Sequence, residues 1–401
     1  MPIEEAHRKL VESIFPVSGE ERVPLADAAG RVLAEPMLAK IDLPAFDNSA
    51  MDGYAIRRRD LSGGRSLKLA GKSFAGAPFE NPVSPGCAVR IMTGAAIPPG
   101  ADTVVMQEYV RVKGDRIFIG NGVEEGEHIR RRGEDVQTGS ELLASGQQVT
   151  TAHIALAAAA GIGSIVAIRR PVVAVFSTGD ELQQPGTALT AGGVYDSNRV
   201  ALVSALRQMH VEVLDLGILP DDPLQISNAL ENAVTKADVI ITSGGVSVGE
   251  ADYTREVIEA LGEICLWKIA MKPGKPFAFG RVRDTPLFGL PGNPVAALVT
   301  FYQLVVPALE KLRGLTPKAQ TSLHARLISP LKKKIGRVDF QRGFYARNQQ
   351  SELEVAAVGQ QGSHILSGLA KANCFIVLPR DSGDQSAGNQ VEITPFLSPF
   401  A

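Results

Sequence analysis

Residues 172–181 read VVAVFSTGDE, an apolar run of strand length that leads directly into small and charged residues. Downstream of it the chain alternates between apolar and amphipathic stretches. Further strands are expected at 211–216, 239–242 and 286–290, and helices over 198–209, 223–236, 252–261 and 294–312. Continuous apolar strands joined by helices of about ten or more residues predict a mostly parallel sheet covered on both faces.

Small residues gather where these strands end. They are Ser177, Thr178 and Gly179 after the first strand, Ser243, Gly244, Gly245, Ser247 and Gly249 after the third, and Pro291, Gly292, Asn293 and Pro294 after the last. Turns rich in glycine expose backbone N–H groups and helix N-termini, which attract phosphate or a similar oxyanion. Alternatively, each glycine only makes a tight turn. This interpretation is less favoured because three such turns are expected at one edge of the sheet. Because ligands bind outside the carboxyl ends of such strands, we expect a ligand site there.

Three lysines, Lys268, Lys272 and Lys275, lie close together after the third helix of this region, and Pro273 and Gly274 separate the last two. Ammonium groups that converge on a restrained loop would make an anion clamp. Solvated surface lysines are the alternative.

Five carboxylates lie in or beside turns that contain glycine or proline: Asp52, Glu181, Asp221, Asp222 and Asp252. If they cluster, they would hold a hard cation such as Mg²⁺, which in turn bridges phosphate oxygens. Taken singly, each is more typical of a helix N-cap or first turn, and Asp222, just before Pro223, is the clearest such candidate.

Composition excludes several classes of protein. At about 100 to 200 residues per domain, 401 residues predict two to four domains. The net charge of −2 provides no global field for nucleic acid or an anionic membrane surface. Three widely spaced cysteines argue against a disulfide framework, and neither a phosphate-loop motif nor G-x-G-x-x-G follows a strand. With neither a signal peptide nor a membrane span expected, the sequence favours a cytoplasmic protein.

The regions on either side of the alternating strand–helix segment have different sequence patterns. A helix is expected over 2–15, a second near Asp27, and an Ala-rich one over 151–160. Residues 42–137 combine short β-type runs with Gly and Pro clusters, and Gly114 marks a hairpin tip. After Pro317 five β segments, 324–328, 338–345, 353–358, 374–378 and 391–394, suggest a small antiparallel barrel or sandwich.

Several longer motifs are spread along the chain. They are FDNSAMDGYA at 46–55, IMTG at 91–94, RRRGED at 130–135, STGDEL at 177–182, the stretch 243–253, KPGKP at 272–276 and GLPGNP at 289–294. As a set, and in this order over essentially the whole chain, they closely resemble the molybdopterin molybdenumtransferase family, which includes MoeA and the gephyrin E-domain. The arginine run by itself is consistent either with a solvated interdomain hinge or salt-bridge lattice, or with an arginine clamp on a substrate phosphate.

The resemblance implies a multi-domain fold of α/β and β parts. The implied domains are an elongated, discontinuous N-terminal dimerisation domain over 1–46 and 138–170, an inserted β-rich domain over 47–137, a molybdopterin-binding-type α/β domain over 171–316 with a mostly parallel sheet, and a C-terminal β-barrel over 317–401. It also implies a homodimer with its active site between subunits. Asp52 and Thr93 of one chain would then face Glu181, Asp252 and the lysines of the other.

The implied reaction is the final step of molybdenum cofactor biosynthesis, in which molybdate enters adenylylated molybdopterin and AMP is released. Residues carried over as catalytic are Asp52, Glu181, Asp252, Lys272 and Lys275, and Asp52, Glu181 and Asp252 are also expected to hold Mg²⁺. Residues carried over for substrate binding are Thr93, Asp221, Lys268, Arg342, Ser363 and the small residues at the strand ends. Pro291 and Pro294 would shape their loop.

Two other functions remain open from the sequence. A molybdopterin adenylyltransferase shares the α/β domain but needs little beyond it. A non-catalytic molybdopterin-binding scaffold would be expected to need an added partner domain or long linker. A molybdopterin adenylyltransferase and molybdoenzyme acceptors are the expected protein partners, and neither nucleic acid nor a membrane is expected.

Overall fold

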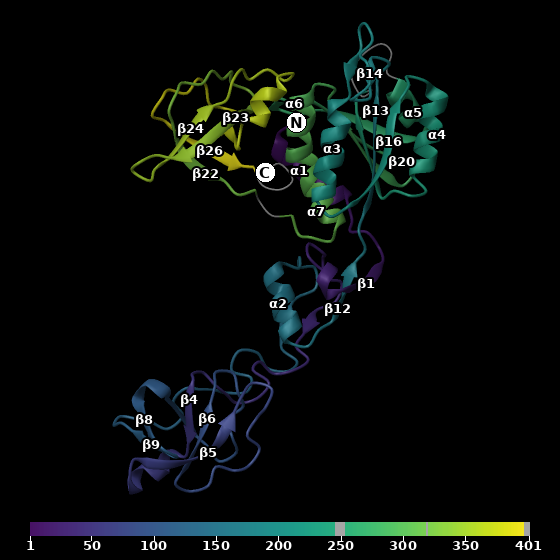
Figure 1. The fold of residues 1–401 in the computed structure, drawn as a ribbon. Helices are drawn as coiled ribbons and strands as arrows, with labels where there is room; N and C mark the ends of the chain where they lie inside the picture. Colours follow the sequence, from purple (N-terminus) through teal and green to yellow (C-terminus); the bar gives the residue numbers. More distant parts are fainter. Residues whose placement is uncertain (245–252, 318–319, 397–401) are drawn as a thin grey trace. The chain divides into compact units, whose positions relative to one another are not determined.

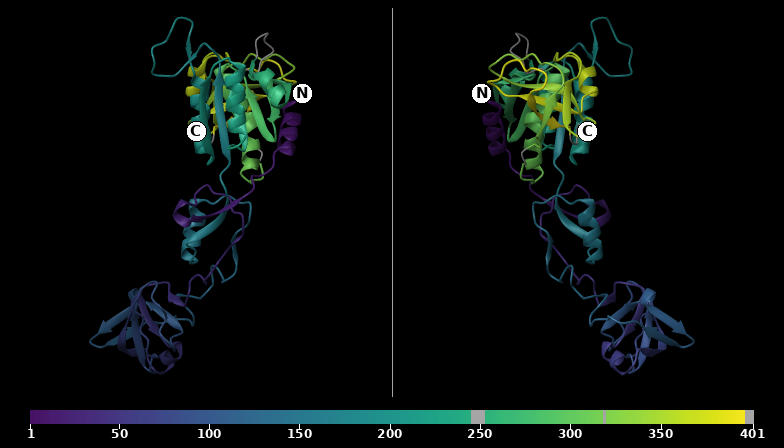
Figure 2. Two further views of the ribbon diagram at one scale, coloured as in Figure 1. Left: turned by 90° about the vertical axis from the view of Figure 1, so that its right-hand side faces the viewer. Right: turned by 90° about the vertical axis from the view of Figure 1, so that its left-hand side faces the viewer.

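The computed structural model describes residues 1–244, 253–317 and 320–396. The chain divides into two compact units (Figure 1 and Figure 2). Unit 1 holds Met1–Glu21, Gly30–Val32 and the chain from Ala167 on, and unit 2 holds Arg22–Ala29 and Leu33–Val166.

A six-stranded sheet forms the centre of unit 1. Its order is β16 (Glu212–Leu219), β13 (Val172–Thr178), β17 (Val239–Ser243), β21 (Thr285–Leu290), β20 (Pro276–Val282) and β18 (Gly262–Lys268). The first four strands are parallel, and the last two run antiparallel at one edge. The mostly parallel sheet predicted from the sequence is confirmed.

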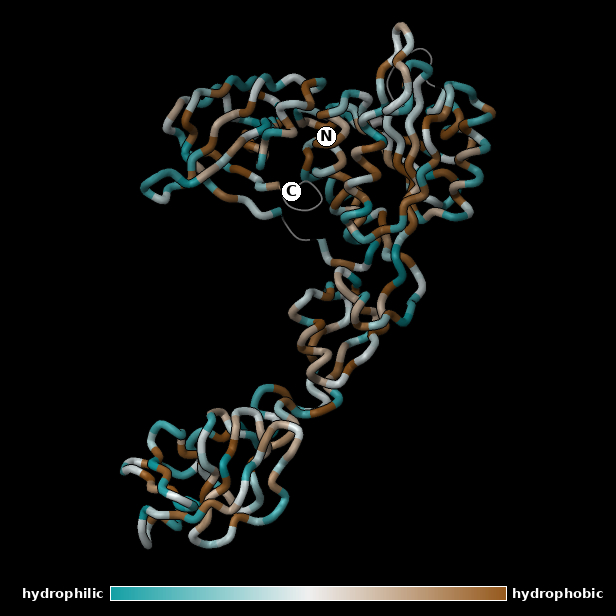
Figure 3. The backbone as a smooth tube through the Cα atoms, viewed as in Figure 1, coloured by the Kyte–Doolittle hydropathy of each residue, from teal (hydrophilic) through white to brown (hydrophobic). Residues whose placement is uncertain are grey.

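Helices cover both faces of this sheet because consecutive side chains of a strand point to opposite faces. Val173 and Val175 of β13 pack in a core with helices on one side, and Ala174 and Phe176 pack in a separate core on the other. The first core includes α1 (Ile3–Ser13), α3 (Ser197–Gln208), α6 (Pro294–Thr300) and α7 (Val306–Leu312), and the second includes α4 (Pro223–Ala233) and α5 (Tyr253–Leu261). Figure 3 shows hydrophobic segments along the central strands.

The helix from α6 to α7 is continuous but contains one π-helical segment, Phe301–Val305. Pro307 has no N–H with which to bond the carbonyl of Gln303, so that carbonyl needs another donor. His7 Nε2 of α1 donates to it. Within the described residues this is the one helical stretch long and apolar enough to cross a membrane, and 78% of its most apolar window is buried inside the protein.

The C-terminal part of unit 1 is a barrel. Strands β23 (Val338–Arg347), β24 (Leu353–Ala357), β22 (Leu323–Leu327), β26 (Gln390–Pro395) and β25 (Cys374–Leu378) pair in that order, and β25 pairs with β23 to close the ring. The short β19 (Met271–Lys272) adds to the outside of β23. All five predicted β segments are present, and of the two predicted architectures the barrel is correct. The prediction that it is antiparallel is wrong for one pair, because β22 and β24 run parallel.

Unit 2 contains a second six-stranded sheet. Its order is β7 (Thr103–Met106), β4 (Gly53–Ile56), β6 (Cys87–Ile91), β5 (Ser66–Ser73), β9 (Arg116–Ile119) and β8 (Val110–Lys113). Gly114 adopts a φ of 61° between β8 and β9, as expected for the hairpin tip.

The remainder of unit 2 is built from short pairings. Strand β2 (Met37–Leu38) pairs with β11 (Glu141–Leu143), β3 (Asn48–Ser49) pairs with β10 (Ile129–Arg130), and α2 spans Thr151–Ala159. The prediction of a second helix near Asp27 is wrong. A single 3-10 turn, Leu25–Asp27, ends there, because Gly30 takes a φ of 74°.

Candidate active site

Four strand ends of unit 1 meet at one edge, because β16, β13, β17 and β21 are parallel and in register. Ser177 lies opposite Ser243, and Ser243 lies opposite Leu290. Thr178 lies opposite Leu219. The carboxyl ends of these strands therefore lie side by side, as the sequence predicted.

Asn198, at the start of α3, joins two of these turns. Its Nδ2 donates to Ser243 Oγ and to the carbonyl oxygen of Gly292, each over 2.8 Å. The side chain of Asn198 is buried, so these bonds fix the end of β17 against the turn before α6.

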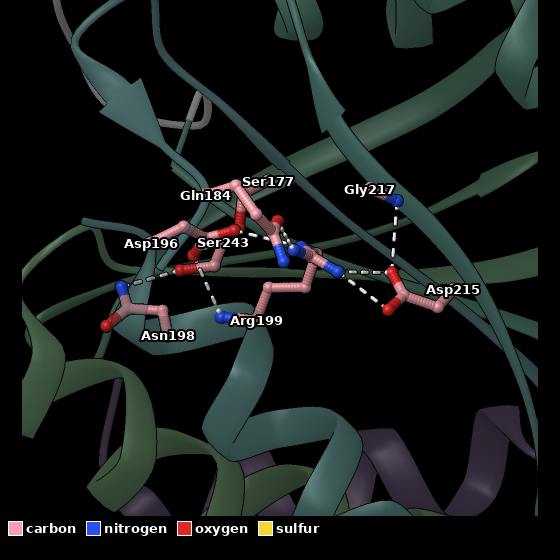
Figure 4. A network of polar contacts seen from close by, with 8 residues as sticks. All are labelled: Ser177, Gln184, Asp196, Asn198, Arg199, Asp215, Gly217 and Ser243. Carbon is pink, nitrogen blue, oxygen red and sulfur yellow. Dashed lines mark hydrogen bonds and ion pairs between the residues drawn. The ribbon is translucent and has the colours of Figure 1, made fainter. Parts of the chain in front are cut away.

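A network of charged groups centred on the buried Arg199 and Asp196 lies under the edge (Figure 4). Arg199 is 5% exposed, and its Nε donates to Asp196 over 2.9 Å while its Nη1 donates to both oxygens of Asp215 over 2.6 Å. Burial disfavours the charged guanidinium, but the bonds and charges of Asp215 and Asp196 outweigh it and raise the pKa of Arg199. Because the two carboxylates neutralise the Arg199 guanidinium, this side chain supports the edge of the sheet and is not available to bind a ligand.

The hydroxyl groups at the strand ends also bond within the protein. Ser177 Oγ donates to Asp196 over 3.2 Å, and Thr178 Oγ1 accepts from Thr254 over 3.3 Å. Both side chains are buried, as is that of Ser243. These hydroxyl groups thus hold the strand ends from beneath, while the buried Asn198 Oδ1 has no partner among the described residues.

Carboxylates gather at the turn after β13. Gly179 has a φ of 145°, and a Cβ at this position would lie 2.7 Å from Glu181 Oε2, so glycine is required. The backbone N of Asp221 donates to Asp180 Oδ1 over 3.2 Å. Burial, followed by the negative charges of Asp180 and Glu181, raises the pKa of Asp221. This corner therefore favours a cation or a proton.

Asp222 has the structural role that its sequence position suggested. Its Oδ1 accepts from the backbone N of Leu224 over 2.8 Å and of Gln225 over 3.2 Å, which caps α4. The N-cap prediction for Asp222 is confirmed.

Asp52 and Thr93 lie in unit 2. Asp52 Oδ1 accepts from both the backbone N and Oγ1 of Thr93, each over 2.8 Å. These bonds to Thr93 lower the pKa of Asp52, so its exposed carboxylate stays ionised. The two residues predicted together for the site are in contact.

The arginine run of unit 2 has acidic partners. Arg131 Nη1 lies 2.7 Å from Asp47 Oδ2, and Arg132 Nε lies 2.5 Å from Asp42 Oδ2. These exposed pairs support the salt-bridge interpretation of the run.

The three lysines of the predicted clamp are in different surroundings. Lys272 Nζ lies 3.1 Å from Asp339 Oδ2 of the barrel. Lys268 and Lys275 are exposed, and neither ammonium group bonds a residue in the described part of the chain. Gly274 packs against α6, where a Cβ would lie 2.3 Å from Thr300 Oγ1.

Arg342 and Ser363 belong to the barrel, and the sequence pattern did not place them near the sheet edge. The backbone N of Val295, in the first turn of α6, donates to the carbonyl oxygen of Ser363 over 3.0 Å. Arg342 is fully buried, and its Nη2 donates to the carbonyls of Gln360 and Gly362. Its Nε and Nη1 are buried with no partner among the described residues. The structure thus brings Ser363 beside the Asn293–Pro294 turn.

Some predicted site residues lie outside the described residues: Gly245, Ser247, Gly249 and Asp252. Within the described ranges there is no group of three or more His, Cys, Asp and Glu side chains that could hold a metal. Asp196, Asn198 and Arg199 were missed by sequence analysis, although an Asp just before a predicted helix is an N-cap signal that could have drawn attention to this segment.

Three family models match the chain in succession. They are the MoeA N-terminal region (domain I and II) over residues 1–161, a probable molybdopterin binding domain over 174–311, and the MoeA C-terminal region (domain IV) over 324–396.

Individual proteins are similar over nearly the whole length. A Haemophilus influenzae protein named molybdopterin molybdenumtransferase is 48% identical over 399 residues, covering 99% of this chain and 98% of the relative. Molybdopterin molybdenumtransferase 2 of Mycobacterium tuberculosis is 37% identical and covers 96% and 98%. The crystal structure of a molybdopterin biosynthesis MoeA protein from Pyrococcus horikoshii superposes with a TM-score of 0.85 at 30% identity, covering 99% of this chain and all of that one. The chain belongs to the molybdopterin molybdenumtransferase (MoeA) family.

Proposed function

We propose that this protein inserts molybdate into adenylylated molybdopterin and releases AMP, which is the final step of molybdenum cofactor biosynthesis. The observation that carries the proposal is the 48% identity, over essentially the full length of both chains, to a relative named for this transferase. The two alternatives are less well supported. The family models also match residues 1–161 and 324–396, which an adenylyltransferase built on the α/β domain does not need.

The strand-end turns and the barrel supply what two oxyanions need. Arg342 offers two buried donors, Nε and Nη1, that no described residue satisfies. Lys268 and Lys275 add exposed positive charge. We assign these groups, with Ser363 and the Pro291–Pro294 turn, to holding molybdate and the phosphate of the pterin. Fixed donors that need no reorganisation would stabilise the charge that develops as the phosphoanhydride is cleaved.

The carboxylates around Glu181 would supply only part of a magnesium site, because the described residues contain no group of three such side chains that could hold the ion by itself. Asp180, Glu181 and Asp221 provide only oxygen donors, which Mg²⁺ prefers, and Asp221 has a raised pKa that a cation would lower. Glu181, with Asp52 and Asp252, would hold the ion. When bound, it would polarise the phosphoanhydride. The protein's own part is to keep these carboxylates ionised, as Thr93 does for Asp52.

The four domain boundaries predicted from the sequence are retained as part of the proposal. The pairing of β2 with β11 supports the discontinuous domain of 1–46 and 138–170, and the pairing of β3 with β10 lies within 47–137. We further propose a homodimer whose active site takes Asp52 and Thr93 from one subunit and Glu181 and the lysines from the other. A location in the cytoplasm, and exchange with a molybdopterin adenylyltransferase and molybdoenzymes, belong to the same proposal.

AMP release tests the reaction directly. The protein is incubated with adenylylated molybdopterin, with and without molybdate and Mg²⁺, and AMP is measured by chromatography. The proposal expects AMP only when molybdate is present, with Mg²⁺ required. Formation of adenylylated molybdopterin from molybdopterin and ATP by this protein alone would favour the adenylyltransferase instead.

Mixing two inactive variants tests the shared site. If Asp52→Ala and Glu181→Ala dimers exchange subunits at random, half of the dimers are mixed, and each mixed dimer has one intact site. The mixture should regain about one quarter of the wild-type AMP-release rate, as a two-fold symmetric interface requires. If each site lies within one subunit, the mixture stays inactive.

A further inference from the structure

The barrel has a basic cavity of which the proposed function uses only Lys272. Its volume is about 590 Å³, and its walls include Lys332, Lys333, Lys334 and Arg337, from the segment between β22 and β23, with Lys272. Asp339 and Asp384 are the two carboxylates that line it. Five cationic side chains against two anionic ones leave the cavity with positive charge.

The basic segment is held firmly in place. The backbone groups of Leu331 and Gln385 bond each other in both directions over 2.9 Å, and Gly336 N donates to Arg380 O over 2.9 Å. The backbone N of Lys333 donates to Asp384 over 2.8 Å. The cations therefore project from a backbone whose position is fixed.

Three of the five cations have partners. Lys272 Nζ lies 3.1 Å from Asp339 Oδ2, and Lys332 Nζ lies 2.8 Å from Asp384 Oδ2. Lys333 is 5% exposed and donates to carbonyls, including that of Ser382 over 2.7 Å. Carbonyls satisfy its hydrogen bonds but do not cancel its charge. Burial lowers the pKa of Lys333, and the negative charges of Asp339 and Asp381 offset this effect only in part.

The other two cations are available to a ligand. Neither the Lys334 ammonium nor the Arg337 guanidinium bonds any residue in the described part of the chain, and both line the cavity. Arg337 is half-buried, and Lys334 is exposed at the rim. Two free cations match the two negative charges of a phosphate monoester, and a guanidinium binds phosphate through two parallel N–H groups.

We propose that this cavity binds the phosphate group of a phosphate monoester, with Lys334 and Arg337 in contact with its oxygens. Its volume lies within the range of cavities that take small organic ligands. None of the described residues lining it has an aromatic ring, so the cavity recognises the phosphate and not a nucleobase. AMP and inorganic phosphate share this chemistry, and the experiment separates them.

Residue-resolved acylation tests the proposal on the full-length protein. Lysines are acetylated briefly at constant ionic strength in the presence of chloride, inorganic phosphate, AMP or adenosine, and modified peptides are quantified by mass spectrometry. Phosphate and AMP should slow the acylation of Lys334 at least about threefold, as bound anion shields the amine, whereas adenosine should not. Lys236, an exposed lysine in the turn before β17, is the internal control and should react at one rate throughout.

Substitution of Arg337 gives the second readout. Arg337→Gln should remove the protection of Lys334, and Arg337→Lys should keep part of it, while thermal unfolding shows that both variants fold. Protection by AMP but not by phosphate would identify the monoester as the occupant, and equal protection would identify the free ion as sufficient. Acylation of Lys334 at the same rate with and without phosphate and AMP would overturn the proposal, as would full protection in Arg337→Gln. AMP release is not measured, so the outcome is independent of the proposed reaction.

Discussion

Two buried arginines of unit 1 show how differently the α/β sheet and the barrel use the same side chain. Arg199, beneath the sheet edge, bonds Asp196, Asp215 and Gln184. Arg342, in the barrel, bonds only two carbonyls through Nη2 and leaves Nε and Nη1 without a partner in the described chain. A buried guanidinium that carboxylates neutralise on both sides, such as that of Arg199, stabilises the fold. A buried guanidinium that lacks some of its partners, such as that of Arg342, is suited to binding an anion.

Removal of the paired arginine should have the largest effect on stability. Arg199→Leu leaves Asp196, which is 2% exposed, without its cation. Breaking a buried pair in this way is expected to lower the free energy of unfolding by about 3–5 kcal/mol. Urea denaturation monitored by circular dichroism measures it. A loss close to zero would show that water already reaches Asp196 and would remove the distinction between the two arginines.

Removal of the partly unpaired arginine should affect activity more than stability. Arg342→Gln is expected to slow AMP release by about 10²-fold, the size found when a fixed donor to a developing oxyanion is lost. Its unfolding free energy should change by less than about 2 kcal/mol, because lost hydrogen bonds are offset by relief of a desolvated charge. The matched control is Arg342→Lys, which keeps the charge and should retain part of the rate. Full activity in Arg342→Gln would exclude Arg342 from the site.

Loss of an exposed ion pair between an arginine and an aspartate should have the smallest effect on stability. Asp42 of unit 2 accepts from Thr138 and Arg132, and these bonds lower its pKa to about 2. Because the folded pKa lies below the unfolded value, the stabilisation by Asp42 is present above about pH 4 and is lost as the pH falls through about 2. Asp42→Asn should therefore be less stable than wild type at neutral pH.

The pH dependence of the stability difference between wild type and Asp42→Asn tests this explanation. Thermal unfolding of wild type and Asp42→Asn should differ at neutral pH and converge between about pH 4 and pH 2. Asp115→Asn, in the β8–β9 hairpin, is the control because its carboxylate bonds no residue in the described ranges. A constant offset down to pH 2 would mean that the Asn variant acts through packing or the unfolded state.

Sequence patterns were most reliable where one local rule decides the structure. The apolar run of β13 predicted a central parallel strand because burial on both faces requires continuous apolar residues. Asp222 before Pro223 predicted the start of α4 because an N-cap is a contact over two or three residues. The helix expected near Asp27 failed because Gly30 breaks the segment and tertiary pairing, not propensity, fixes its path.

The sequence by itself determined the four parallel strands of the central sheet, the glycine-rich segments that follow them, the five barrel strands and, through motifs spread over the chain, the family, but it missed the edge strand β18. Only the tertiary structure decided which charged side chains have partners. Arg199 and Arg342 look alike in the sequence, and so do Lys272, paired with Asp339, and Lys334, which has no partner in the described chain. The reason is physical: the free energy of a charge depends on its burial and on groups within a few ångströms, and these come from segments far apart along the chain.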